Sequence, residues 1–247
     1  MKNAAANLET VDLDALGAMD AEQLIRFAFE TFGSRAAIGT SLQKTGVVMI
    51  DIAARLDVDF RVFFIDTLLN HDETYALLDD VEKRYGITIE RFEPDPEDIE
   101  SLKRAVGQWA HYLARPSCCH VRKRKPLQNA LATLEVWISG LRADQSEHRQ
   151  DQARKADWAQ DDRGRQILKL NPLLDWTAED VDRYTRRFDL PYNTLYDYVS
   201  RYGERYHVIG CKLCHIPTRD GLDRRAGKFP WEQGRKECGL HDHGSGI

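Results

Sequence analysis

The chain has 247 residues and carries 35 Lys and Arg side chains against 40 Asp and Glu, so its formal charge is −5. With 42% hydrophobic and 30% charged residues it can bury a core, which excludes a disordered or fibrous protein. The mild acidity argues against a general DNA- or RNA-coating protein. The length fits one large domain, or one domain with a tail.

No part of the sequence is typical of export or of a membrane span. Residues 1–20 lack an apolar stretch and carry four acidic side chains, and no apolar run approaches the ~20 residues that cross a bilayer. We therefore expect a cytoplasmic protein with neither a membrane nor a nucleic acid as partner. Cysteines stay reduced in that compartment, so clustered ones are expected to be metal ligands or catalysts.

The first part of the sequence alternates predicted strands and helices. Asp20 with Gln23 forms a capping box before an apolar helical stripe that Gly33 ends, and Thr177 with Asp180 caps a later helix. This order predicts an α/β fold with a mostly parallel sheet flanked by helices. The expected strands are 35–39, 60–65, 88–92, 136–139 and 167–170, the expected loop is 40–46, and the further helices are 47–56, 71–85 closed by Gly86, and one running toward Phe188.

The composition and periodicity of the sequence change after about residue 200. Residues 201–247 are rich in Gly, Arg, His and Cys and have little periodicity, which is typical of a functional tail or lid. We expect an α/β domain over 1–200 and a C-terminal segment over 201–247.

Two polar loops follow the first two predicted strands. In an open α/β sheet, ligands bind at the carboxyl ends of the strands. The loop 40–46 contains Ser41 and Lys44 before a predicted helix and could hold a phosphate, although it lacks the glycine spacing of a Walker A loop. Asp66 and Thr67 end the next strand and could contact a ribose or base.

A third loop follows the strand 136–139. Gly140 permits close approach of the backbone to a ligand, and Arg142 and Arg149 could pair with anionic oxygens. Each of the three loops alone is a weak signal, and the first alone is better explained as an ordinary polar connection. Together, at one edge of a sheet, they favour a nucleotide pocket.

The five cysteines divide into four plus one. Cys118 and Cys119 are adjacent, and Cys211 and Cys214 form a Cys-x-x-Cys half-site of the kind that binds zinc or iron–sulfur. Two buried apolar thiols are the alternative for either pair. The two pairs together favour a four-thiolate site, and the spacing leaves zinc and [4Fe–4S] both open.

The fifth cysteine and a run of cations complete the set. Residues 122–125 are all Arg or Lys and indicate a local anion site in a net-acidic chain, although such runs are usually solvated surface. Cys238 stands between Lys236 and His241 in a Gly-rich segment, where its thiol is either reactive or incidental.

These residues together resemble the adenylyl-sulfate (APS) reductases of the APS/PAPS reductase family. The matching pieces span about residues 35–241 and are most specific in the two cysteine pairs and the terminal Lys-Glu-Cys-Gly-Leu-His. They are Cys118-Cys119 followed by Arg122-Lys123, the segment 139–146, Ile209-Gly210-Cys211-x-x-Cys214, Arg225-Ala226-Gly227 and residues 236–241.

The resemblance implies an adenine-nucleotide α-hydrolase-like fold with the C-terminal tail over the active site. It implies that Cys238 attacks the sulfur of APS, that AMP leaves, and that reduced thioredoxin releases sulfite from the S-sulfocysteine, in assimilatory sulfate reduction. It also implies substrate contacts for Lys123, Arg225 and His241, and approximately for Arg149. The four ligands of an implied [4Fe–4S] cluster are Cys118, Cys119, Cys211 and Cys214.

The sequence departs from the family pattern in several loops. The family's acids after the first strand are replaced by Gln43-Lys44-Thr45-Gly46, and Asp66-Thr67 is followed by Leu68 rather than Gly. Lys228 replaces an expected arginine, so sulfate binding would depend more on a point charge than on a bidentate fork. Cys211-x-x-Cys214 carries Leu213 where Pro is common.

Other functions stay open beside APS reduction. The nearest alternative is a reductase of phosphoadenylyl sulfate (PAPS), or one that accepts both nucleotides. A tRNA-thiolation enzyme should carry Ser-Gly-Gly-x-Asp-Ser in the first loop, which this chain lacks. A zinc-stabilised nucleotide-binding protein without activity is the remaining alternative. The oligomeric state is open, with a homo-oligomer as one alternative.

Overall fold

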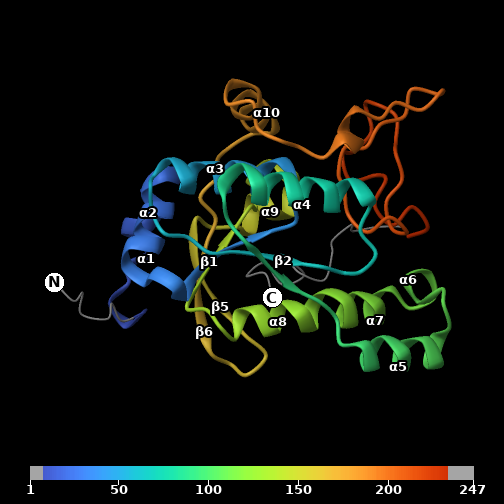
Figure 1. Ribbon diagram of the computed structural model, residues 1–247, viewed down its shortest axis with the longest axis horizontal. Helices are drawn as coiled ribbons and strands as arrows, with labels where there is room; N and C mark the ends of the chain where they lie inside the picture. Colours follow the sequence, from blue (N-terminus) through green and yellow to red (C-terminus); the bar gives the residue numbers. More distant parts are fainter. Residues whose placement is uncertain (1–7, 233–247) are drawn as a thin grey trace.

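A six-stranded sheet forms the centre of the computed structural model, which describes residues 8–232 (Figure 1). The strand order is β3-β2-β1-β4-β6-β5, and every neighbouring pair is parallel except β5 with β6. The predicted α/β fold with a mostly parallel sheet is therefore confirmed. The strands are β1 (Ala36–Thr40), β2 (Val62–Ile65), β3 (Ile89–Phe92), β4 (Val136–Ser139), β5 (Ala156–Gln160) and β6 (Gln166–Leu170).

Helices cover both faces of this sheet (Figure 1). One face packs on α1 to α4 and α10, and the opposite face packs on α8, with α5 to α7 beyond it. The helices are α1 (Leu13–Gly17), α2 (Ala21–Phe32), α3 (Lys44–Arg55), α4 (Asp72–Tyr85), α5 (Pro96–Val106), α6 (Ala110–Leu113), α7 (Arg115–Cys119), α8 (Lys125–Leu131), α9 (Glu147–Gln152) and α10 (Ala178–Arg187). None of the helices within residues 8–232 is long and apolar enough to cross a membrane.

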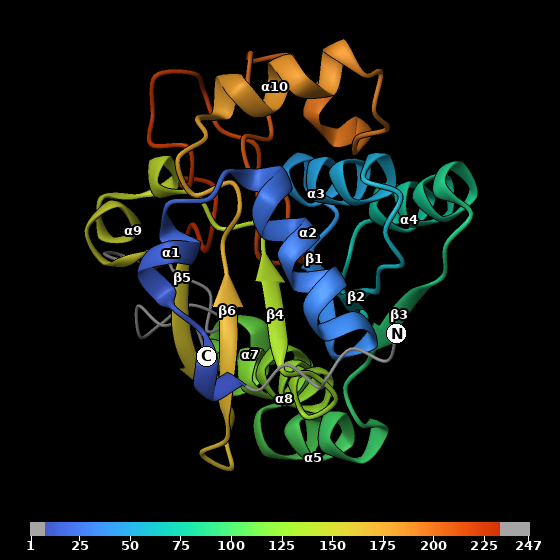
Figure 2. The same cartoon turned by 90° about the vertical axis from the view of Figure 1, so that its left-hand side faces the viewer.

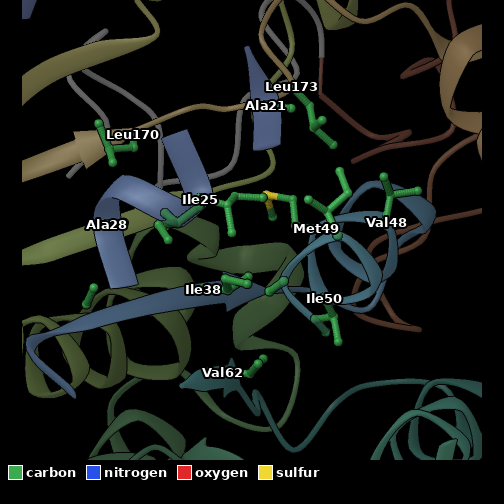
Figure 3. Close-up of a cluster of buried hydrophobic side chains, with 14 of the residues drawn as sticks. Ala21, Ile25, Ala28, Ile38, Val48, Met49, Ile50, Val62, Leu170 and Leu173 are labelled. Atoms are coloured by element: carbon green, nitrogen blue, oxygen red, sulfur yellow. The ribbon is translucent and has the colours of Figure 1, made fainter. Parts of the chain in front are cut away.

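The alternation of side chains along β1 divides the core into two clusters. Ile38 points into the larger cluster, where it meets Met49 of α3 and Ile25 of α2 (Figure 3). Ala37 belongs to the smaller cluster, with Trp137 of β4. Because a parallel sheet is covered on both faces, its strands are apolar almost throughout.

The two predicted capping boxes are present. The Asp20 side chain accepts from the Gln23 backbone N–H at 2.8 Å, and the Gln23 side chain accepts from the Asp20 N–H at 2.9 Å. Thr177 and Asp180 cap α10 in the same way. Gly86 ends α4 with a φ of 64°, a conformation that glycine adopts without strain.

The boundary predicted between the first loop and its helix is wrong by one turn. Helix α3 begins at Lys44, so the last three residues of the expected loop 40–46 are helical. A Cβ at Gly46 would lie 2.2 Å from Oγ1 of Thr40, so only glycine lets this first turn pack against the end of β1. The helix can begin at Lys44 because the backbone at Gly46 packs closely against Thr40, and the polarity of the loop residues does not indicate this contact.

The antiparallel strand β5 was not predicted. Its sequence, Ala-Asp-Trp-Ala-Gln, has neither an apolar run nor turn residues directly at both ends. It pairs with β6 over five positions, from Ala156 opposite Leu170 to Gln160 opposite Gln166. Helices α1, α5, α6, α7 and α9 were also missing from the expected elements, whereas a helix opened by Pro126 was expected and corresponds to α8.

The segment of the first cysteine pair is helical throughout. Helix α7 ends at Cys119, a π-helical turn covers His120–Arg124, and α8 follows directly. Pro126 lacks the N–H that would bond to the carbonyl of Arg122, so the wider π turn lies where the α-helical ladder is interrupted. The cation run 122–125 therefore lies on the π turn and the first residue of α8.

A buried carboxylate joins three helices of the larger cluster. Asp51 of α3 is 2% exposed and accepts hydrogen bonds from Tyr85 of α4 at 3.0 Å, from Tyr184 of α10 at 2.9 Å and from Arg55 at 2.6 Å. Burial, together with this carboxylate, raises the pKa of both tyrosines. The contact holds α10 against α3.

We expect Asp51→Ala to lower the free energy of unfolding by about 1–3 kcal/mol, because two partly buried tyrosine hydroxyls lose their acceptor. Urea denaturation followed by circular dichroism measures this. The control is Asp79→Ala on α4, whose side chain is 74% exposed and should change stability by less than about 0.5 kcal/mol. Equal stability of the Asp51 variant and the wild type would contradict the role of this network.

Candidate active site

A cavity of about 470 Å³ opens at the carboxyl ends of β1, β2 and β4. In Figure 2 the arrows of β4 and β6 point toward the edge that is covered by α10 and the segment after it. The first turn of α3, the residues after β4, and residues 205–228 line the cavity. It therefore lies where the topology of a parallel α/β sheet predicts a ligand site.

Positive charge dominates the described lining residues. They include eight Lys or Arg side chains against three Asp, and each of these carboxylates has a cationic or histidine partner. Such an excess in a concave site raises the local concentration of anions. The cations are Lys44, Lys123, Arg142, Arg149, Arg205, Arg224, Arg225 and Lys228, and the acids are Asp144, Asp182 and Asp220.

The start of α3 forms one wall. Lys44 donates to Asp182 of α10 at 2.7 Å, and its ammonium lies 5.1 Å from the ring of Tyr192 and 5.0 Å from that of Tyr196. Burial raises the pKa of the Tyr196 hydroxyl. The aromatic cage and the carboxylate hold the Lys44 charge in one place.

The loop after β4 forms the next wall. Arg142 is 7% exposed and donates to Thr45 at 2.6 Å and to Asp144 at 3.0 Å. Arg149 of α9 is also buried and donates to Gln145. Short bonds to the loop and to α3 thus fix both guanidinium groups at the cavity before any ligand arrives.

An aromatic surface forms the floor. Gly39 of β1 lies between Trp137 and Phe63, and a Cβ on Gly39 would lie 2.6 Å from Nε1 of Trp137 and 2.7 Å from Cζ of Phe63. The glycine therefore lets the two rings approach each other across β1. Because such rings offer flat apolar area, the cavity can take a planar ring as well as an anion.

The turn after β2 has two different roles. Asp66 Oδ1 accepts from the Leu68 N–H at 2.9 Å, from Asn70 at 3.0 Å and from Tyr75 at 2.8 Å. Burial, followed by this hydrogen bond, raises the pKa of Tyr75 to about 12. Asp66 is absent from the lining, whereas Thr67 lines the cavity. Asp66 therefore stabilises the turn that presents Thr67.

The two cysteine pairs lie on neighbouring segments joined through Thr67. The Cys211 thiol donates to Thr67 Oγ1 at 3.3 Å, and Arg122 donates to the Thr67 carbonyl at 2.8 Å. All four thiols are buried, and burial raises the pKa of Cys118, with Arg122 opposing and Cys211 adding to that effect. The two pairs are thus close enough for Cys118 and Cys211 to interact electrostatically.

The donor set of these pairs fits a thiolate-bound metal or cluster in its chemistry, because four buried cysteines face nearby cations. Arg115, which interacts with Cys119, lies over the ring of Phe229 at 4.4 Å, and the Phe229 N–H donates to the Cys214 carbonyl at 2.8 Å. Within residues 8–232, however, no group of three or more His, Cys, Asp or Glu converges closely enough to hold a metal ion. The four-thiolate site stays a prediction.

The cavity brings together most of the residues predicted to contact a ligand. Asp66 alone among those described lies outside its lining, and Cys238 and His241 fall outside the described residues. The predicted contact residues that do line the cavity are Ser41, Thr67, Lys123, Gly140, Arg142, Arg149, Arg225 and Lys228.

Sequence reasoning missed several lining side chains. Tyr196, Arg205, His207 and Arg224 lie in a stretch without periodicity, and Asp182 lies on the polar face of a helix that reads as ordinary surface. A signal was present for Arg205 and Arg224, because the segment after residue 200 is rich in arginine.

Comparisons with known proteins agree on one family. The family model for the phosphoadenosine phosphosulfate reductase domain matches residues 35–217. A protein of Bacillus subtilis named adenosine 5'-phosphosulfate reductase 2 is 34% identical over 226 residues, which is 90% of each chain. An adenosine 5'-phosphosulfate reductase of Neisseria meningitidis is 38% identical over 211 residues, covering 83% of this chain and 82% of its own.

Among solved structures, the phosphoadenylyl-sulfate reductase of Candida auris has the same fold. Its TM-score is 0.69 at 23% identity, covering 86% of this chain and all of the other. An FMN adenylyltransferase of Candida glabrata has a TM-score of 0.55 at 12% identity, over 83% of this chain and 63% of its own. The predicted adenine-nucleotide α-hydrolase-like fold is thereby confirmed.

We expect Arg142→Gln to weaken the binding of AMP, used as a dianionic nucleotide probe, by about tenfold or more. The change removes one cation from the cavity and releases the carboxylate of Asp144 toward the anion. Isothermal titration calorimetry gives the dissociation constant. Arg163→Gln, in an exposed turn outside the cavity, should leave it unchanged. Equal AMP affinity of the Arg142 variant and the wild type would contradict an anion site here.

Proposed function

The chain belongs to the phosphoadenosine phosphosulfate reductase family, and from this membership we propose that it reduces adenylyl sulfate (APS) to sulfite and AMP. It is an oxidoreductase acting on a sulfur group, as its relatives are. The proposal includes a role in assimilatory sulfate reduction in the cytoplasm, where thiols stay reduced.

The observation that carries the proposal is the charge of the cavity. APS has a phosphate joined directly to a sulfate, and the described lining offers eight cations against three carboxylates. The floor at Gly39 offers an aromatic surface to the adenine ring. Lys123, Arg142, Arg149, Arg225 and Lys228 are the proposed anion contacts, with Ser41, Thr67 and Gly140 beside them.

The proposed chemistry starts at Cys238. Its thiolate attacks the sulfate sulfur, the new S–S bond forms as the S–O bond to the phosphate breaks, and AMP leaves with the electron pair. Thiolate, sulfate and phosphate are all anionic, so the cations of the cavity, with His241 from the same terminal segment, lower the barrier by screening them. Preorganised bonds such as Arg142 with Thr45 support this role.

A second thiol step completes the proposed reaction. One thiolate of a reduced dithiol protein such as thioredoxin attacks Sγ of the Cys238–sulfo adduct, so a mixed disulfide forms as sulfite leaves. The second thiol of the dithiol protein then breaks this mixed disulfide and regenerates the thiol of Cys238. The dithiol is oxidised to a disulfide while the sulfur is reduced from sulfate to sulfite. The electrons thus come from the dithiol, and the cavity needs no redox group of its own.

We include a [4Fe–4S] cluster bound by Cys118, Cys119, Cys211 and Cys214 in the proposal. The burial of the four thiols supports it, as do the hydrogen bonds that Cys211 and Arg122, three residues after Cys119, donate to Thr67. When bound, such a cluster supplies electrostatic influence beside the substrate anion. We propose that Lys123 acts between the two, which its position after the first pair and in the lining of the cavity supports.

Reduction of PAPS is the second candidate. The family model is named for the phosphorylated nucleotide, whereas the relatives at 34–38% identity are named for APS. Steady-state assays with both nucleotides decide between them. A preference for PAPS would overturn the APS assignment and leave the family intact.

We expect Cys238→Ser to abolish sulfite formation while AMP still binds, because the hydroxyl is a far weaker nucleophile than a thiolate. Sulfite release from APS with reduced thioredoxin measures this. Cys118→Ser is a comparison that retains the nucleophile. Sulfite formation by the Cys238 variant at the wild-type rate would contradict the proposed nucleophile.

We expect Cys211→Ser to lose most of the iron and sulfide that anaerobically purified wild-type protein contains, since thiolate ligands are removed from a soft-ligand site. Iron and sulfide analysis with visible absorption measures the loss. Cys238→Ser is the matched control and should retain both. Zinc without iron or sulfide in the wild-type protein would contradict the cluster.

A further inference from the structure

A lysine lies fully buried behind the floor of the cavity. Lys169 of β6 is 2% exposed, on the face of the sheet where β6 otherwise presents Ile167 to α8. Lysine is almost never fully buried unless its charge has a partner or a function. The residue does not line the cavity, and the reaction steps described above do not use it.

Three neighbours connect Lys169 to the cavity. In the β4–β6 ladder it stands opposite Trp137, and its ammonium lies 4.9 Å from the centroid of that ring. Asp157 stands opposite it on β5. Arg149 of α9 is close enough to repel it. Trp137 and Arg149 both line the cavity, so Lys169 lies behind side chains that face it.

These charges determine how easily Lys169 holds its proton. Burial, followed by the charge of Arg149, lowers the pKa of Lys169, Asp157 opposes them, and the resulting pKa is about 8. The element that packs on this face, α8, contributes the apolar side chains of Leu127 and Leu131. Near neutral pH, Lys169 is therefore a second positive charge behind Arg149 that is held only weakly.

We propose that Lys169 is a positioning residue that takes up a proton when a doubly charged phosphate or phosphosulfate anion binds beside Arg149. The anion offsets the repulsion between the two cations, so the charged form of Lys169 becomes more favourable in the complex. Lys169 then adds positive potential through the wall of the cavity without touching the ligand. This inference rests on the proposed nucleotide function of the same site.

The sign of the pH dependence follows by linkage. The anion raises the pKa of Lys169 above its value of about 8 in the empty protein. Between these two pKa values the complex binds more protons than the separate partners, so affinity falls as the pH rises through that interval. The affinity changes by about tenfold for each unit by which the anion raises the pKa.

Calorimetric titration with AMP at pH 8.5, in Tris and in Tricine, measures the protons taken up per nucleotide. AMP is already a dianion there, since the second phosphate pKa is ~6. If the anion raises the pKa by one unit, Lys169 takes up roughly half a proton. Lys169→Met should lose that uptake and show a flatter dependence of affinity on pH between 8 and 9.5.

Two further variants separate charge from packing. Lys169→Arg stays protonated at every pH used, so it should bind AMP without the uptake of the wild type. Lys155→Met removes a partly buried lysine that does not line the cavity and whose ammonium lies 2.6 Å from the carboxylate of Asp175, and this variant should keep the full uptake. Should Lys169→Met not fold, the comparison of wild type with Lys169→Arg decides.

Each remaining outcome overturns a definite claim. AMP binding with the same proton uptake in the wild type and in Lys169→Met or Lys169→Arg overturns the role of Lys169 and leaves the nucleotide site standing. Failure of the wild-type protein to bind AMP at all overturns the proposed function, and this inference with it.

Discussion

The concentration of positive charge in one small cavity is the constraint on which the rest of the site depends. Arginines and lysines repel one another at close range, so they stay together only where carboxylates, aromatic rings and short hydrogen bonds hold them. Arg142 is held by Asp144 and Thr45, and Lys44 by Asp182 and two tyrosine rings. These stabilising side chains come from different segments of the fold.

Long-range topology brings those side chains together. Thr45 and Lys44 start α3, Arg142 follows β4, and Asp182 lies on α10, which the buried Asp51 joins to α3. A parallel sheet places the carboxyl ends of its strands, and the loops that leave them, at one edge, so charges far apart in the sequence meet there. The same geometry places Lys169 behind the wall, where it responds to the ligand through Arg149.

Local signals were sufficient to predict much of the fold. The capping boxes at Asp20 and Thr177 and the apolar run of β4 each report a short-range preference that the tertiary structure retains. The start of α3 was not predictable in this way, because it depends on the close approach of Gly46 to Thr40. Likewise β5 depends on pairing with β6 rather than on its own residues.

The residues of the candidate site also divide into those that the sequence predicts and those that depend on the tertiary structure. Arg142, Arg149 and Gly140 were predictable because they follow a strand, whereas Asp66 followed a strand too but is used within its own turn. Arg205 and Arg224 come from a region without the hydrophobic periodicity that would indicate where side chains point. Lys169 read as one polar residue in a strand, and only the ladder with Trp137 reveals that it is buried.

The central claim is that the cationic cavity presents a phosphosulfate anion to the thiol of Cys238. Anaerobic incubation of the full chain with APS, followed by mass spectrometry of the C-terminal peptide, tests it most directly. The account predicts a sulfo group on Cys238 that disappears when reduced thioredoxin is added. An unmodified Cys238, with sulfite still produced on adding thioredoxin, would contradict the account.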